Sequence, residues 1–213
     1  TAALRLELRA LNAAHRSAEI PRVVAELVKR KVYDAEHGEM IRASAHADVL
    51  RTLSHDAAGL RDYWYRVPES DRTISRVARA AAQSFMTLGG DREAAEILAR
   101  SIDAHWNAEL VALYADCRTT DSTRQLETAE RWLVDHNQDS TLLFALGRLC
   151  ERAQLWGKAQ TYYEASLALA SSWRTHVALG EMLARLDQHD AANAHLAAAL
   201  KLALSELRAR PAP

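Results

Sequence analysis

The chain has 213 residues, of which 49% are hydrophobic and 26% charged, a composition typical of a folded globular protein and not of a disordered one. Its formal net charge is −1, so it lacks the basic excess that accompanies nucleic-acid binding, and no apolar run is long enough to span a bilayer. Glycine and proline are scarce while Ala, Leu, Arg and Glu dominate, which favours helices over a many-stranded fold.

The first 68 residues are predicted to form a divergent helical part. The stretch ALRLELRALNAAHRSAEIPRVVAELVKRKV indicates two helices, with Pro21 near the start of the second, where proline is tolerated. The stretch GLRDYWYRVP then predicts a short aromatic helix that ends before Pro68. Because three adjacent aromatic side chains cannot all face one side, Tyr63 and Trp64 are candidate anchors for a partner. The alternative is that they pack in the core beneath an irregular linker.

The rest of the chain repeats. A shift of 33 residues places the run Ala145-Leu146-Gly147 on Ala178-Leu179-Gly180 and Ala159 on Ala192. These are the small and large positions of a tetratricopeptide repeat, in which small residues let two antiparallel helices approach and large ones fill the space beside them. Four such units are predicted, followed by a tail at 210–213: 69–106, 107–139, 140–172 and 173–209.

The predicted fold is therefore all-α, a single domain over residues 1–213. We expect a right-handed superhelical α-solenoid of tetratricopeptide-type helix pairs, with roughly twelve helices. The two cysteines, Cys117 and Cys150, have no metal-site or redox spacing. Cys150 takes the position of a large core residue, so we expect a buried thiol and not a reactive one.

A groove lined by arginine is predicted on the concave face. The first helix of each repeat lines this face, and all but four of the 27 cationic side chains are arginine. The predicted partner-binding groove contains Arg76, Arg79, Gln83, Phe144, Arg148, Arg152, Glu181 and Arg185. Guanidinium groups bind carboxylates through two parallel hydrogen bonds, so the groove is expected to take an acidic peptide segment or a carboxylate-bearing ligand. The alternative is that these arginines are solvated or pair with Glu151 and Glu181 inside the groove.

Several stretches, taken in order, resemble the HemY family of bacterial proteins: VVAELVKRKVY, LRDYWYRVP, GGDREAAEILARSIDAHWNAELVALYA and RQLETAERWLVDHNQDSTLLFALGRLCERAQLWGKA. The resemblance covers most of the chain. It implies that this chain is the soluble helical-repeat part of a longer protein, anchored in the bacterial inner membrane by an N-terminal hairpin, with the repeats in the cytoplasm. It also implies a role close to late haem biosynthesis.

These observations predict a non-catalytic scaffold that binds another protein. The resemblance implies haem-biosynthesis enzymes as partners, and a homodimer is a further expectation, since an exposed repeat end can pair with itself. No enzyme is expected, because the sequence has no nucleophile beside a base, no phosphate-binding loop and no dinucleotide fingerprint. No metal, cofactor or nucleic-acid partner is expected either. The alternative is a porphyrin or haem carrier in which the groove arginines bind the propionates and His176 or an aromatic side chain contacts the ring.

Overall fold

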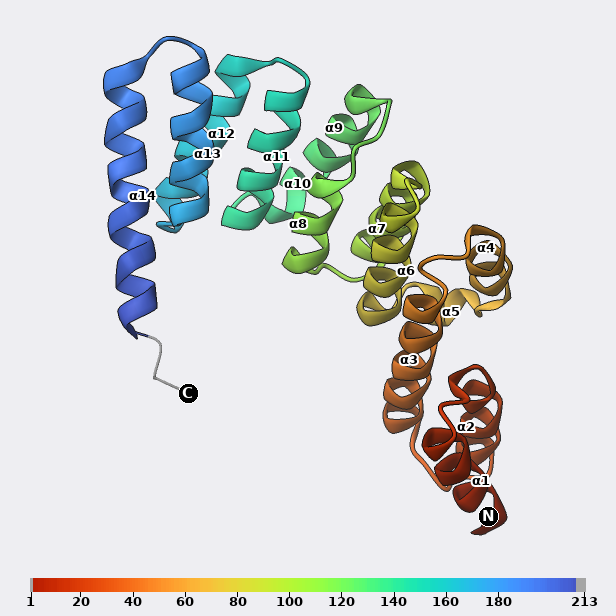
Figure 1. Cartoon of the computed structure of the whole chain (residues 1–213). Helices are drawn as coiled ribbons and strands as arrows, with labels where there is room; N and C mark the ends of the chain where they lie inside the picture. Colours follow the sequence, from red (N-terminus) through yellow and green to blue (C-terminus); the bar gives the residue numbers. More distant parts are fainter. Residues whose placement is uncertain (1, 210–213) are drawn as a thin grey trace. The chain divides into compact units, whose positions relative to one another are not determined.

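The computed structural model describes residues 2–209, and within this range all regular secondary structure is helical (Figure 1). The chain divides into two compact units, Thr1–Cys117 and Arg118–Pro213. The first unit contains α1 (Ala2–Ala13), a 3-10 turn (Ser17–Glu19), α2 (Ile20–Lys29), α3 (Ala35–Thr52), α4 (Ala57–Arg66), α5 (Glu69–Arg72), α6 (Ser75–Thr87), α7 (Asp91–Ala104) and α8 (Ala108–Asp116). The second unit contains α9 (Ser122–Arg131), α10 (Leu133–His136), α11 (Ser140–Arg152), α12 (Trp156–Leu169), α13 (Trp173–Arg185) and α14 (His189–Ala209).

Short-range signals set most helix boundaries. Pro21 lies in the first turn of α2, as the sequence predicts, because a first-turn residue has no intrahelical partner for its N–H. Asp34 caps α3 by accepting a hydrogen bond from the His37 amide at 2.7 Å, and Asp139 caps α11 by accepting from Thr141 and Leu142. Gly89, predicted as a turn, adopts a left-handed φ of 74° between α6 and α7.

A buried polar network joins α3, α4 and α5 in the first unit. Arg42 donates two hydrogen bonds to the Asp71 carboxylate, at 3.1 and 3.3 Å, and His46 Nε2 lies 3.4 Å from the same carboxylate. The other ring nitrogen of His46 hydrogen-bonds the Tyr63 hydroxyl at 2.9 Å. Burial opposes ionisation of Asp71, but the nearby His46 ring and the Arg42 guanidinium outweigh it and lower the Asp71 pKa to about 2.

Two helix pairs of the second unit pack by the same device, 33 residues apart. A Cβ atom added to Gly147 on α11 would lie 2.5 Å from two ring carbons of Tyr163 on α12. A Cβ atom added to Gly180 on α13 would lie 2.9 Å from Leu196 Cγ on α14. Only a residue without a side chain lets these helices approach so closely, so the glycines fix the packing of both pairs.

The structure adds three details to the sequence predictions. The described residues contain fourteen α-helices, more than the roughly twelve predicted. Helices such as α5 and α10 are too short to give a helical periodicity in the sequence. Helix α9 ends at Arg131 and α10 begins at Leu133, with buried Trp132 between them. The division between the two units falls inside the predicted repeat 107–139. The predicted repeat boundaries stay a prediction, and the predicted tail, 210–213, lies outside the described residues.

Candidate functional site

A pocket of about 700 Å³ in the second unit gathers four arginines, and we call it the arginine pocket. It is lined by Arg118, Thr119, Ser122, Gln125, Arg148, Glu151, Arg152, Tyr163, Ala178, Glu181 and Arg185. Helical spacing explains the lining. Arg148, Glu151 and Arg152 are three and four residues apart and share one face of α11, while the opposite face carries buried Leu146 and Cys150.

Glu151 is the central acceptor of the pocket. Its carboxylate forms an ion pair with Arg185 of α13 and accepts a hydrogen bond from the Tyr163 hydroxyl at 2.7 Å. Arg185 also lies over the Trp156 ring, 6.0 Å from its centroid. Burial raises the Tyr163 pKa above its usual range, so the phenol stays protonated and remains a donor to Glu151. A carboxylate of the protein thus already pairs with the Arg185 guanidinium group.

The structure brings together four of the eight predicted groove residues: Arg148, Arg152, Glu181 and Arg185. Phe144 lies beside them, half-buried, with its ring centroid 5.8 Å from that of Tyr163. The predicted pairing of groove arginines with groove glutamates is realised for Arg185 and Glu151. The connection before α9 adds residues that helical periodicity did not indicate, namely Arg118, Thr119 and Ser122. Its unusual length and polarity were the only signal in the sequence.

The other predicted groove residues lie in the first unit. Arg79 pairs with Glu109, and Gln83 is exposed on α6. Arg76 lines two smaller pockets, one of about 250 Å³ with Asp48 and one of about 490 Å³ with acidic residues of the α3 start. The arginine pocket is confined to the second unit and contains only four of the eight residues of the predicted groove.

The aromatic cluster of α4 is oriented differently from the prediction. Tyr63 and Trp64 are both buried. Tyr63 contacts His46, and the Arg72 guanidinium lies over Trp64, 5.5 Å from the centroid of the Trp64 ring. Neither is available as a surface anchor. Tyr65 is the exposed member, with 73% of its surface accessible. It lines a pocket of about 190 Å³ with Trp64, Phe85 and Arg72.

The histidine proposed for a haem carrier lies away from the arginine pocket. His176 Nδ1 is 2.9 Å from His195 Nδ1, across the contact between α13 and α14. Neither histidine is among the pocket-lining residues. Within the part of the chain that the structure describes, no three His, Cys, Asp or Glu side chains are arranged to hold a metal ion. None of the helices from residue 2 to residue 209 has both the length and the apolarity that a membrane crossing needs.

No family model and no curated protein matches the sequence. Solved structures of MamA are similar in fold. One MamA crystal structure superposes with a TM-score of 0.55 at 16% identity, covering 76% of this chain and 96% of that one. A second covers 92% of this chain and 98% of its own, with a TM-score of 0.51 at 14% identity. MamA residues 41 to the end from Desulfovibrio magneticus RS-1 give 0.53 at 15% identity, covering 75% and 96%.

These comparisons confirm the predicted fold class, an all-α helical repeat of the tetratricopeptide type. They contradict the HemY assignment, which is wrong: the similar solved structures named above are of MamA, and no family model supports HemY. The physical reason is that the matching stretches are the packing positions of helix pairs, which any tetratricopeptide-type chain shares. The haem-enzyme partners and the inner-membrane location rested on that assignment, and nothing in the structure supports them.

Proposed function

We propose that the chain is a non-catalytic scaffold that binds a partner protein by taking an acidic segment of it into the arginine pocket. The observation that carries the proposal is the convergence of Arg118, Arg148, Arg152 and Arg185 on one pocket. Its fold supports the scaffold part of the proposal, because helical repeats present long faces of short helices to other proteins.

The pocket has the size and charge for carboxylate side chains. About 700 Å³ falls within the range of protein ligand sites and can hold several side chains of an extended peptide. Four arginines face two glutamates in the lining, so the pocket keeps a cationic excess. Arginine is the side chain best suited to this role, because its planar fork donates two parallel hydrogen bonds to one carboxylate.

Glu151 gives the pocket an internal competitor. It occupies Arg185 through the ion pair described above, in the way that a carboxylate of the partner would. An incoming acidic segment must therefore compete with Glu151 for Arg185. Mutating Glu151 should consequently tighten binding of acidic ligands, whereas a merely structural ion pair would give no such gain.

The porphyrin carrier is the weaker of the two expectations. A haem ring needs an axial ligand or an aromatic platform beside the propionate-binding arginines. The pocket lining contains Tyr163, which is buried and committed to Glu151, and no histidine. The absence of a cofactor stays a prediction, and titration of the chain with haem, followed by its absorption band, tests it.

Selection of peptides from a random library displayed on phage tests the scaffold proposal without knowledge of the natural partner. The library is selected on the wild-type chain, and the selected peptides are then titrated against the double variant Arg148→Gln/Arg152→Gln. The control is Arg5→Gln/Arg9→Gln on α1, which removes two exposed arginines of the same spacing.

We expect the selected peptides to be enriched in Asp and Glu. Loss of two charge-assisted hydrogen bonds, each contributing about 1 kcal/mol, should weaken their binding by roughly 30-fold in the pocket variant and leave it unchanged in the control. Peptides without an acidic excess, or peptides that bind the pocket variant as tightly as the wild type, would contradict the proposal.

A further inference from the structure

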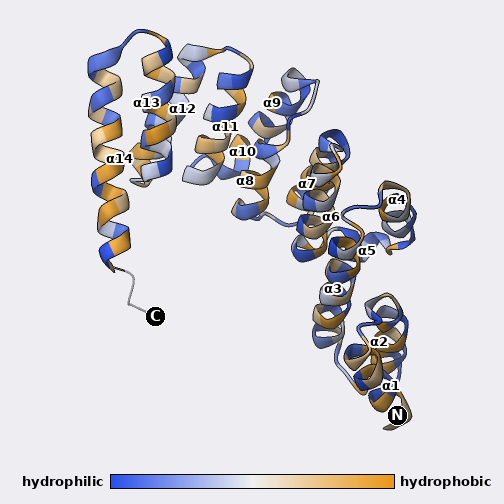
Figure 2. Cartoon of the chain, viewed as in Figure 1, coloured by the Kyte–Doolittle hydropathy of each residue, from blue (hydrophilic) through white to orange (hydrophobic). Residues whose placement is uncertain are grey.

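The last helix, α14, exposes a continuous row of leucines. Leu196 and Leu204 are 38% and 43% accessible, and Leu200 and Leu207 are 62% and 63% accessible. At about 100° per residue the four side chains fall within an arc of roughly 80°, so they form one stripe along the helix. Figure 2 shows apolar colour along most of α14. A stripe of this kind on a soluble surface marks an interaction site.

The preceding repeat shows what such a stripe is built to contact. The 33-residue shift aligns Leu196 with Tyr163 of α12, which is fully buried, and Leu200 with Leu167, which is half-buried. On α12, Tyr163 is buried against Gly147 of α11, and α13 also contacts α12. On α14, Leu196 packs in the same way against Gly180 of α13 but stays 38% accessible, and Leu200 is 62% accessible. Leu200, Leu204 and Leu207 thus form an apolar face that no helix among the described residues covers.

Helix α14 also extends beyond its partner. It spans 21 residues, whereas α13, against which it packs, spans 13. Its C-terminal turns, which carry Leu204 and Leu207, project past α13 in Figure 1. An isolated helical overhang with exposed leucines is unfavourable in water unless another helix covers it.

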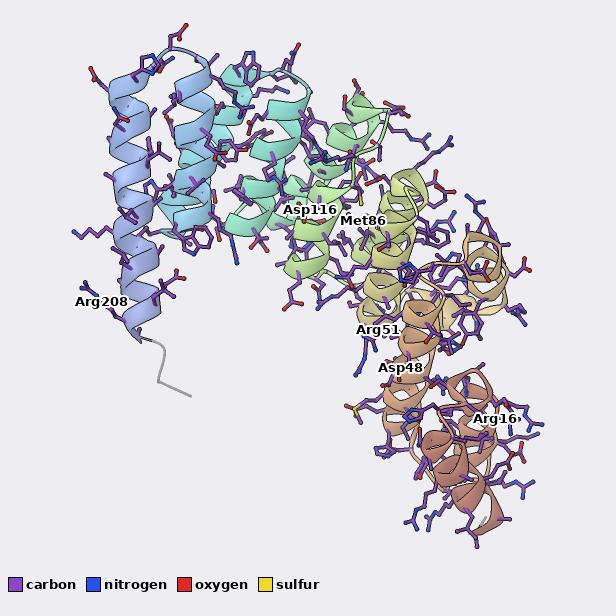
Figure 3. All side chains as sticks on the ribbon, viewed as in Figure 1. Arg16, Asp48, Arg51, Met86, Asp116 and Arg208 are labelled. Atoms are coloured by element: carbon purple, nitrogen blue, oxygen red, sulfur yellow. The ribbon has the colours of Figure 1, made fainter. Side chains whose placement is uncertain are left out.

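The charges on one flank of the stripe indicate which helix covers it. Asp190 and Arg208 are 18 residues apart, which is five helical turns, so they lie on the same flank about 27 Å apart. Both side chains are exposed, and Figure 3 shows Arg208 pointing outward from the C-terminal end of α14. In an antiparallel pair related by a two-fold axis, equal flanks of the two helices face each other.

A two-fold axis at Leu200 pairs the leucines and the Asp190 and Arg208 charges, although it also places Lys201, on the same flank, near Lys201 of the second copy. It places Leu200 against Leu200 of the second copy and Leu196 against Leu204. It also brings Asp190 within about 3 Å, along the axis, of Arg208 of the second copy, once at each end of the pair. The α14 helix of a second copy thus matches α14 in length and in apolar pattern.

We propose that two copies of this chain dimerise through antiparallel pairing of their α14 helices, centred on Leu200. This surface is separate from the arginine pocket, so the dimer leaves the pocket proposal unaffected. One helix per copy buries less area than a standard protein interface, so the dimer should be weak, with a dissociation constant in the micromolar range.

Sedimentation equilibrium of the full chain across micromolar concentrations tests the proposal. Leu200→Glu should raise the dissociation constant at least about tenfold, since it brings two carboxylates together at the axis. Leu6→Glu is the matched control, because Leu6 is 63% accessible and lies on α1. Asp190→Arg and Arg208→Asp should each weaken the dimer, and the two together should restore it.

A single cysteine at the axis gives a readout of geometry. In a pair centred on Leu200, Leu200→Cys faces its own copy and should form an intermolecular disulfide, while native Cys117 and Cys150 are buried. A chain that stays monomeric at all concentrations would overturn the proposal and leave the stripe to a different protein. A dimer that tolerates Leu200→Glu, or that gives no crosslink through Leu200→Cys, would equally overturn it.

Discussion

Substituting Gly147 by alanine should destabilise the α11–α12 pair. The new Cβ would lie 2.5 Å from Tyr163 Cδ1 and Cε1 and 3.0 Å from Cγ, so the ring itself must move and not just the tip of a flexible side chain. Tyr163 is fully buried and bonded to Glu151, which limits that movement. Overpacking of this kind costs about 1–3 kcal/mol, offset by about 1 kcal/mol of helix propensity gained by alanine. The expected net loss is about 1 kcal/mol.

Gly157→Ala is the matched control, because a Cβ at Gly157, in the first turn of α12, meets no atom within 4 Å. It should be neutral or stabilise the chain by up to about 1 kcal/mol. Urea unfolding followed by circular dichroism gives the free energies. Hydrogen exchange of α11 and α12 amides separates the second unit from the first, since the two units need not unfold together. If Gly147→Ala stabilised the chain as much as Gly157→Ala, the close contact that defines the repeat would be refuted.

Three further predictions concern single side chains. Asp71→Asn should lower the free energy of unfolding by about 2 kcal/mol at neutral pH. Because the Asp71 pKa is lowered to about 2, the ionised carboxylate stabilises the folded chain fully above its unfolded-state pKa near 4, and this stabilisation is lost as the pH falls to 2. Urea unfolding of both proteins between pH 2 and 7 checks this, and curves that did not converge at low pH would contradict it. Burial raises the Cys150 pKa to about 11, so its thiol should resist a disulfide reagent at pH 8 until the chain unfolds; rapid labelling of the native protein would be inconsistent with that burial. Glu151→Gln should tighten binding of acidic peptides several-fold by releasing Arg185, as measured by fluorescence polarisation, and weaker binding would show that Glu151 positions the arginine for its ligand.

The helix pairs were predictable because their signals are local. Gly147 and Tyr163 are 16 residues apart, and the small-large pattern that they share with Gly180 and Leu196 repeats at a fixed period. Cys150 was placed in the core by the same pattern, and it is fully buried. Local periodicity also placed Arg148 and Arg152 on one helix face. Ancestry did not follow from these signals, since packing positions report the fold and not the family.

Features that depend on distant contacts could not be predicted. Pairing of a groove arginine with Glu151 was only one of two alternatives, and the choice of Arg185, 34 residues away, depends on how the two helices are placed side by side. The contribution of Arg118 depends on the path of an irregular connection, which periodicity does not describe. The orientation of Tyr63, Trp64 and Tyr65 was decided by a buried histidine on another helix, which hydrogen-bonds Tyr63.

The most direct test of the central claim follows the arginines themselves. Nuclear magnetic resonance resolves the Nε–Hε signals of arginine side chains, and single Arg→Gln variants assign them. On titration with an acidic peptide selected by the chain, the signals of Arg148, Arg152 and Arg185 should shift together, at concentrations that match the affinity. Those of Arg5 and Arg9 should stay fixed. Shifts spread evenly over all arginines, or absent from the pocket, would show that carboxylates do not bind there.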